Sequence, residues 1–249
     1  MKLTEALQNS GVSAIVYGES GIGKTHFAGT LPGKTLIIAA EANGIKTLAK
    51  FPDAAKANLS VEFLPAPAKT IDDTSAQYNA YFDQLMLRDL GVDNVVLDSA
   101  SELAATLLIQ RTDPVKNGGA PTMKNYNEVQ SSMRRYMRIL RDLAILKGHN
   151  VLVLALEAEM VLSQTGDNTI TSKAHPAMSG KKLAPEIEGL FDIVGHMEKL
   201  PDGRRFIRLE GTETFVAKDR FGRKGCFADG KIFLSGKTGN EQNTNTKEK

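Results

Sequence analysis

The sequence has only one cysteine, Cys226, among 249 residues. A single cysteine excludes an intramolecular disulfide and the usual cysteine-rich zinc sites. No apolar run approaches the ~20 residues that a helix needs to cross a bilayer, and residues 1–5 lack the apolar stretch of a secretory signal. We therefore expect a cytoplasmic location, which is the bacterial host cytoplasm if the gene is phage-encoded, and no membrane partner.

An excess of charge of one sign is also missing, because 31 basic residues balance 29 acidic ones to a net charge of +2. A nucleic-acid partner would therefore need a local basic surface. The hydrophobic fraction of 41% is ordinary for a globular protein. We divide the chain into an N-terminal arm at 1–11, one large domain at 12–235, and a tail at 236–249. The tail has no apolar residue, so we expect it to be disordered.

Apolar strands alternate with helical segments along the large domain, which predicts an α/β fold with a mainly parallel, twisted sheet flanked by helices. Strands are expected at 13–17, 35–40, 61–64, 94–98 and 150–156, and helices from about Lys24 and at 71–88, 101–109 and 126–147. In the last helix, apolar residues recur at helical spacing, and Gly148 is placed to end it.

The C-terminal third is less regular. Short apolar runs at 193–197, 205–209 and 214–217 predict an antiparallel edge of the sheet, with a hairpin turn around Gly203. Residues 158–185 contain many polar and glycine positions and predict a long loop, which in a compact domain is often functional.

One motif indicates phosphate binding. Gly18-Glu19-Ser20-Gly21-Ile22-Gly23-Lys24-Thr25 fits the pattern G-x-x-x-x-G-K-[ST], between a strand and a helix. The glycines let backbone N–H groups wrap around phosphate, and the following helix directs its positive end at the anion. Lys24 supplies charge to the β- and γ-phosphates. We expect this loop, with the adjoining His26, to bind ATP.

Two residues predict a Mg²⁺ site beside this loop. The Thr25 hydroxyl is the expected direct ligand, and Asp98, which ends an apolar strand, is placed to orient the ion through water. The alternative interpretation of this strand end is structural: Ser99 or Ser101 caps the next helix.

Two glutamates are candidates for activating the attacking water. Glu41 follows the second strand, at the edge where parallel strands place their ligands. Glu157 follows the 150–156 strand and competes for the role, or instead senses the γ-phosphate and relays its state onward. A solvated loop acid is the structural alternative for Glu41.

Basic residues gather in two predicted loops. They are Lys116 and Lys124 in the first, and Lys173, His175, Lys181 and Lys182 in the second. Such loops at one end of a sheet can follow a nucleic-acid backbone, although few aromatic residues accompany them. The arginines of the 126–147 helix are interpreted as a solvated face. Lys218 and Arg220 are either a finger that reaches ATP on a neighbouring subunit or a charge cluster at a hairpin end.

Residues 12–235 resemble the RecA-like phage P-loop ATPases of the Sak single-strand annealing group. Seven features in order carry the resemblance: the 18–25 loop, Glu41 with Gly44, Val95-Val96-Leu97-Asp98-Ser99, the 126–146 helix, the 151–156 strand, Leu190-Phe191-Asp192-Ile193-Val194-Gly195, and Ala217-Lys218-Asp219-Arg220.

The resemblance implies an ATP-responsive homo-oligomer that binds single-stranded DNA and promotes annealing in phage recombination. It implies Glu41 as the catalytic base and DNA-contacting loops at about 112–125 and 158–182. Glu157 stands where the family often has glutamine. A single-strand DNA-binding protein is a further candidate partner. The alternatives are a P-loop kinase of a small molecule and a nucleotide-gated assembly protein with little turnover.

Overall fold

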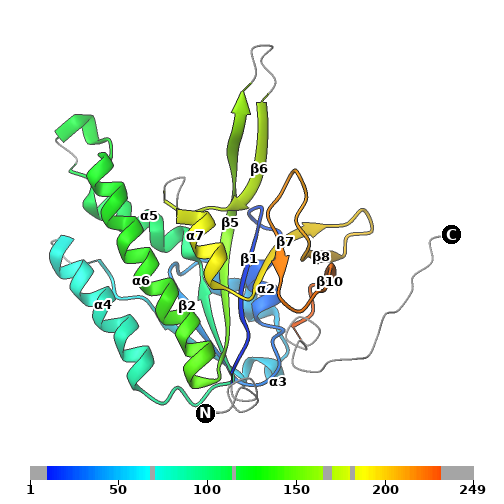
Figure 1. Ribbon diagram of the computed structural model, residues 1–249. Helices are drawn as coiled ribbons and strands as arrows, with labels where there is room; N and C mark the ends of the chain where they lie inside the picture. Colours follow the sequence, from blue (N-terminus) through cyan, green and yellow to red (C-terminus); the bar gives the residue numbers. More distant parts are fainter. Residues whose placement is uncertain (1–9, 68–70, 114–115, 165–169, 180–182, 231–249) are drawn as a thin grey trace, which may run out of the picture.

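A computed structural model describes residues 10–67, 71–113, 116–164, 170–179 and 183–230 (Figure 1). Most of the predicted N-terminal arm, the tail at 236–249, and Lys181 and Lys182 lie outside the described residues. The expectations placed on them stay predictions.

The described chain alternates strands and helices over most of its length. The strands are β1 (Ser13–Gly18), β2 (Thr35–Ala39), β3 (Leu59–Phe63), β4 (Asn94–Asp98), β5 (Asn150–Gln164), β6 (Ile170–Pro176), β7 (Ile193–Lys199), β8 (Arg205–Arg208), β9 (Lys218–Asp219) and β10 (Gly225–Phe227). The helices are α2 (Lys24–Ala28), η1 (Gly44–Lys50), α3 (Asp53–Lys56), α4 (Ile71–Leu87), α5 (Ala100–Arg111), η2 (Lys116–Gly119), α6 (Met123–Lys147) and α7 (Leu183–Leu190).

In the described residues the sheet has ten strands in the order β10-β8-β7-β1-β5-β4-β2-β3, with β6 paired to β5 and β9 to β7. Strands β1 to β5 pair in parallel, whereas β8 and β9 run antiparallel to β7, and β10 runs antiparallel to β8. This arrangement confirms the predicted mainly parallel α/β sheet with an antiparallel C-terminal edge.

Two details of that edge differ from the prediction. Strand β7 pairs in parallel with β1 on one side, so it continues the parallel sheet rather than closing it. Residues 214–217 form no strand, and only Phe215 makes an isolated bridge, to Ala174. Apolar runs this short do not specify their pairing partner, which long-range packing decides.

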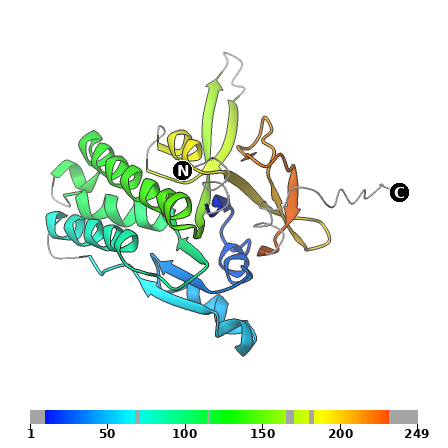
Figure 2. The same cartoon turned by 60° about the horizontal axis from the view of Figure 1, so that its bottom comes forward.

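Helices cover both faces of the sheet (Figures 1 and 2). Alternate residues of each strand point to opposite sides. Val95 and Leu97 of β4 pack with α4, α5, α6 and α7, whereas Val96 between them packs with Phe27 of α2 and Leu48 of η1. Burial on both faces fixes the central strands and so fixes where their carboxyl ends meet.

Helix α6 carries the longest apolar stripe. Its predicted core residues Val129, Met133, Met137, Leu140 and Ala144 are all buried. Gly148 ends the helix in the left-handed conformation, with φ 76°, as predicted. Within the described residues, no helix combines the length and apolar character needed to span a membrane.

The predicted loop at 158–185 is wrong. Strand β5 continues to Gln164 and pairs antiparallel with β6, and the two strands extend beyond the body of the molecule (Figure 1). We call residues 157–164 and 170–176 the β arm. Glu159 and Val161, which point to the same side of β5, are both exposed. The run of polar and glycine residues at 163–169 interrupts the strand pattern, so the two strands were predicted as one loop.

Candidate functional site

The phosphate motif adopts a tight loop between β1 and α2. Gly21 and Gly23 have φ values of 76° and 106°, in the left-handed region that glycine occupies without strain. A side chain at Gly23 would also collide with the guanidinium of Arg205. The loop conformation therefore depends on the glycines that the motif supplies.

Lys24 is the buried cation of this loop, with 8% of its surface exposed. Its Nζ donates to the carbonyl oxygens of Gly18 and Glu19, at 2.8 Å each. Burial lowers the pKa of Lys24, whereas the nearby carboxylates of Asp98 and Glu157 oppose that shift. An ammonium that is held by neutral carbonyls in a partly desolvated loop is strongly stabilised by an added anion. This environment fits the binding of a phosphate group.

Thr25 and Asp98 meet across the site. The Thr25 hydroxyl donates to Asp98 Oδ2 at 2.7 Å. Burial raises the pKa of Asp98, and the bonds from Thr25 and the charge of Lys24 oppose the shift. Ser99 caps α5, since its Oγ accepts from the Glu102 backbone N–H at 3.3 Å. The helix-capping role therefore belongs to Ser99 and leaves the Asp98 carboxylate facing Thr25.

This donor set suits Mg²⁺ shared with a nucleotide. Among the described residues, no group of three or more histidines, cysteines or acidic residues is arranged to hold a metal alone. A hydroxyl and one carboxylate fit an ion that keeps several waters and takes its other ligands from phosphate oxygens. Thr25 and Asp98 are the residues that would hold it.

One cavity of about 580 Å³ joins these groups. Its lining includes Ser20, Gly21, Gly23, Lys24, Thr25, His26, Glu41 and Asp98. Gly44 lies at the centre of the acidic side, because a Cβ there would be 3.6 Å from Asp98 Oδ2 and from Thr25 Oγ1, and 3.9 Å from Glu41 Oε1. The structure thus brings Glu41 to the expected metal position.

Several lining residues were not found from the sequence. Thr47 and Lys50 of η1, Glu102 of α5, and Arg205 of β8 also line the cavity. Glu102 stands three residues beyond Ser99, and this S-x-x-E spacing at the start of a helix offered a signal. Arg205 comes from β8, which β7 separates from β1 in the sheet, and no local pattern links it to the phosphate loop.

Glu157 takes part in a different contact. Its Oε2 lies 2.7 Å from His196 Nε2 on β7, and Glu157 is not among the residues that line the cavity. The His196 ring stacks on Phe215, with centroids 4.8 Å apart, and packs against Tyr17, at 5.1 Å. The geometry therefore favours Glu41 over Glu157 for contact with water in the cavity.

Tyr17 ties this cluster to the β arm. Its hydroxyl donates to the Val216 carbonyl at 2.6 Å and lies 3.1 Å from the Ala174 carbonyl of β6. Burial raises the pKa of Tyr17, so the hydroxyl stays protonated. Because Tyr17 directly precedes Gly18, the phosphate loop, the base of the arm and the segment before β9 meet at one cluster. We call Tyr17, Glu157, His196 and Phe215 the hub.

The predicted DNA-contacting residues lie in different surroundings. Lys124, at the start of α6, is exposed and lies 3.9 Å from Glu128, and Lys116 belongs to η2. Lys173 of the β arm is half-buried. His175 is only 6% exposed, with its Nδ1 2.8 Å from the Pro176 carbonyl. With so little of its surface exposed, His175 offers little to a DNA strand in this structure, and its contact with DNA stays a prediction.

The finger candidates lie on the antiparallel edge. Arg220 pairs with Asp192, at 3.0 Å, and neither it nor Lys218 lines the cavity of its own chain. Burial lowers the pKa of Lys218. These two cations therefore lie outside the cavity that holds the phosphate loop of the same chain.

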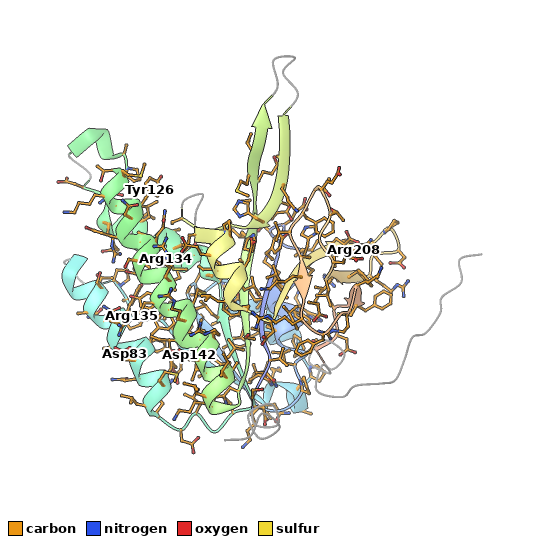
Figure 3. All side chains as sticks on the ribbon, in the orientation of Figure 1. Asp83, Tyr126, Arg134, Arg135, Asp142 and Arg208 are labelled. Atoms are coloured by element: carbon orange, nitrogen blue, oxygen red, sulfur yellow. The ribbon has the colours of Figure 1, made fainter. Side chains whose placement is uncertain are left out.

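The arginines of α6 are largely ion-paired. Arg135 contacts both oxygens of Asp83 on α4, at 2.6 Å each, and Arg134 pairs with Glu186 on α7. Figure 3 shows Arg135 and Asp83 at the junction of α4 and α6. These pairs are consistent with the interpretation of a solvated face.

Comparison with known proteins identifies the domain. The profile of a family described as an AAA domain matches residues 10–221. A search among curated proteins finds no match. The matched region includes the phosphate loop, strands β1 to β9, the hub and Arg220.

Proposed function

The chain belongs to the AAA domain family, whose members are nucleotide-binding P-loop ATPases, and we propose that it couples ATP hydrolysis to the annealing of single-stranded DNA. The observation that carries the ATPase part is the cavity that joins Lys24, Thr25, Asp98 and Glu41. It combines an anion-binding loop, a metal-binding pair and a candidate base.

The chain's own residues divide the work of binding ATP. The N–H groups of the loop and the start of α2 surround the phosphates, and Lys24 turns its ammonium from its own carbonyls toward them. Thr25 and Asp98 would hold Mg²⁺, which when bound would offset negative charge on the phosphates.

Glu41 is the residue that we propose activates water. It follows β2, is exposed to the cavity, and lies with Thr25 and Asp98 around Gly44. A carboxylate in that position can accept a proton from a water that attacks the γ-phosphate. Glu41→Gln should therefore slow hydrolysis while ATP still binds.

Single-stranded DNA is the proposed partner. The β arm and the start of α6 point to the same end of the molecule (Figure 1). Lys116, Lys124 and Lys173 belong to the described residues, and Lys181 and Lys182 complete the proposed surface. The resemblance to the Sak group supports this choice, as does the ability of lysines to neutralise phosphates along a flexible strand.

The hub offers a route between the two sites. A change at the phosphate loop reaches Tyr17 through Gly18, and the hub joins Tyr17 to both strands of the arm through Ala174 and Glu157. We propose that Glu157 and His196 transmit the nucleotide state to the arm. In a homo-oligomer, Lys218 and Arg220 would contact the ATP of a neighbouring subunit.

The test is an ATPase assay of the full chain with and without single-stranded DNA, together with annealing of complementary strands. We expect DNA to raise turnover and ATP to change annealing. Lys24→Ala serves as the inactive control. ATP turnover that ignores DNA, combined with absent DNA binding, would refute the DNA proposal and favour a small-molecule kinase.

A further inference from the structure

The arginines of the C-terminal edge differ in how their charges are matched. Four of them form ion pairs of 2.6–3.0 Å with carboxylates. These pairs are Arg204–Asp202, Arg208–Glu198, Arg220–Asp192 and Arg223–Asp219. Arg205 is the exception, because no carboxylate among the described residues lies within ion-pair distance of it.

The strand register places Arg205 over the phosphate loop. On β8, Arg205 and Ile207 point to one face, where Ile207 packs in the cluster that contains Phe27 of α2. Arg208 points to the other face, where it pairs with Glu198. Strand β8 therefore directs Arg205, and not Arg208, toward the start of α2.

Arg205 contacts the loop itself. Its Nε donates to the Ile22 carbonyl, and its guanidinium packs against Gly23, where any side chain would collide with it. It also lines the same cavity as Lys24 and Thr25. The loop thus has a second cation at its surface, in addition to the lysine of the motif.

The guanidinium of Arg205 leaves most of its hydrogen-bond donors unused in the described structure. This group carries five N–H donors in a rigid fork that matches phosphate oxygens. In the described structure Arg205 makes one hydrogen bond, to a neutral carbonyl. A partner of opposite charge is therefore lacking at the point where the cavity is built to receive an anion.

From this geometry we infer that Arg205 is a nucleotide-binding residue, which donates in cis to the polyphosphate of the bound nucleotide. The inference rests on the proposed ATP site and adds a residue to it. It also makes the antiparallel edge part of the site, so that β8 contacts the nucleotide directly. The competing interpretation is a structural role, which we call a brace, in which Arg205 only donates a hydrogen bond to the Ile22 carbonyl.

The test compares Arg205→Gln with Arg208→Ala in the full chain. Glutamine keeps an amide donor for the Ile22 carbonyl but removes the charge, whereas Arg208 is a paired arginine of the same strand outside the cavity. The probes are MgATP and inorganic tripolyphosphate, each titrated against the protein. Thermal melting without ligand reports any loss of folding.

We expect Arg205→Gln to weaken both MgATP and tripolyphosphate about 10- to 100-fold, as loss of a charge-assisted bond does. Arg205→Lys should recover part of this loss, and Arg208→Ala should bind both probes within about twofold of wild type. Melting without ligand should change little.

Two results would overturn the inference. One is unchanged affinity of Arg205→Gln for both probes, and the other is weaker MgATP binding with unchanged tripolyphosphate binding, because the lost contact would then not be to phosphate. Failure of the wild type itself to bind either probe would instead refute the ATP site. If Arg205→Gln melts early, Arg205→Lys decides, since a brace requires only a donor and predicts full affinity.

Discussion

The phosphate loop and the β arm stand at the same end of the sheet but are built differently. The loop is held by buried groups: Lys24 on two carbonyls, Thr25 on Asp98, and α2 against the core. The arm is held by its own strand pairing and by the hub at its base, and Val161 on it is exposed. Rigid support suits the chemistry of ATP, whereas a projecting arm suits a long partner.

The two regions therefore differ in how many side chains carry the proposed function. At the loop, a few contiguous side chains carry the proposed activity, so a single substitution should have a large effect. On the arm and around Lys124, the proposed DNA contacts are spread over several exposed cations, so each should contribute little. Four predictions test this contrast.

The largest effect is expected for Lys24→Ala. Loss of the buried cation removes stabilisation of the phosphate charge, and ATP turnover should fall at least ~100-fold. Phosphate release is the measurement, with Lys147→Ala, at the exposed end of α6, as the matched control. Turnover close to wild type in Lys24→Ala would remove the proposed role of the loop.

The next effect concerns Asp98→Asn. Asparagine keeps the size of the side chain but not the charge, so the Mg²⁺ concentration for half-maximal turnover should rise about 10- to 100-fold. Because burial raises the pKa of Asp98, protons compete with Mg²⁺ for its carboxylate, so the Mg²⁺ concentration for half-maximal turnover should also rise as the pH falls. An unchanged Mg²⁺ requirement would contradict the assignment.

A smaller and more selective effect is expected for His196→Phe. The ring stacking with Phe215 can persist, but the contact with Glu157 is lost. Turnover without DNA should change less than about threefold, while the effect of ATP on DNA affinity should shrink by about 1–3 kcal/mol. DNA binding with and without ATP is the measurement, and Arg208→Ala is the control. Retained coupling would show that the hub is structural only.

The smallest effect per residue is expected on the DNA surface. Replacing Lys173, Lys181 and Lys182 together by alanine should lower the slope of log affinity against log salt by about 2, because each phosphate contact on single strands adds ~0.7. Titration at several salt concentrations measures the slope. Alanines at Lys34, Lys56 and Lys147 provide the comparison. If alanines at Lys173, Lys181 and Lys182 leave the slope unchanged, the DNA binds to another surface.

The same contrast explains what the sequence could predict. The central strands, α6 and the phosphate site depend on local patterns, such as strand burial on two faces and the contiguous residues of the motif, and these were found. Asp98 and Glu41 were also within reach, because carboxyl ends of parallel strands share an edge.

The missed features all depend on distant partners. Strands β5 and β6 form the arm through pairing with each other, and the polar residues 163–169 that connect them hid this pairing in the sequence. The burial of His175, the contact between Glu157 and His196, and the position of Arg205 over Gly23 result from how separate segments pack. No periodicity or short motif encodes such contacts.

The central claim is that the cavity around Lys24, Thr25 and Asp98 holds a nucleotide triphosphate with its metal. The most direct measurement is an equilibrium titration of the full chain with fluorescent ATP, with and without Mg²⁺. The account predicts a saturable complex that tightens with Mg²⁺ and is lost in Lys24→Ala. A linear, unsaturable signal, or equal binding by wild type and Lys24→Ala, would contradict it.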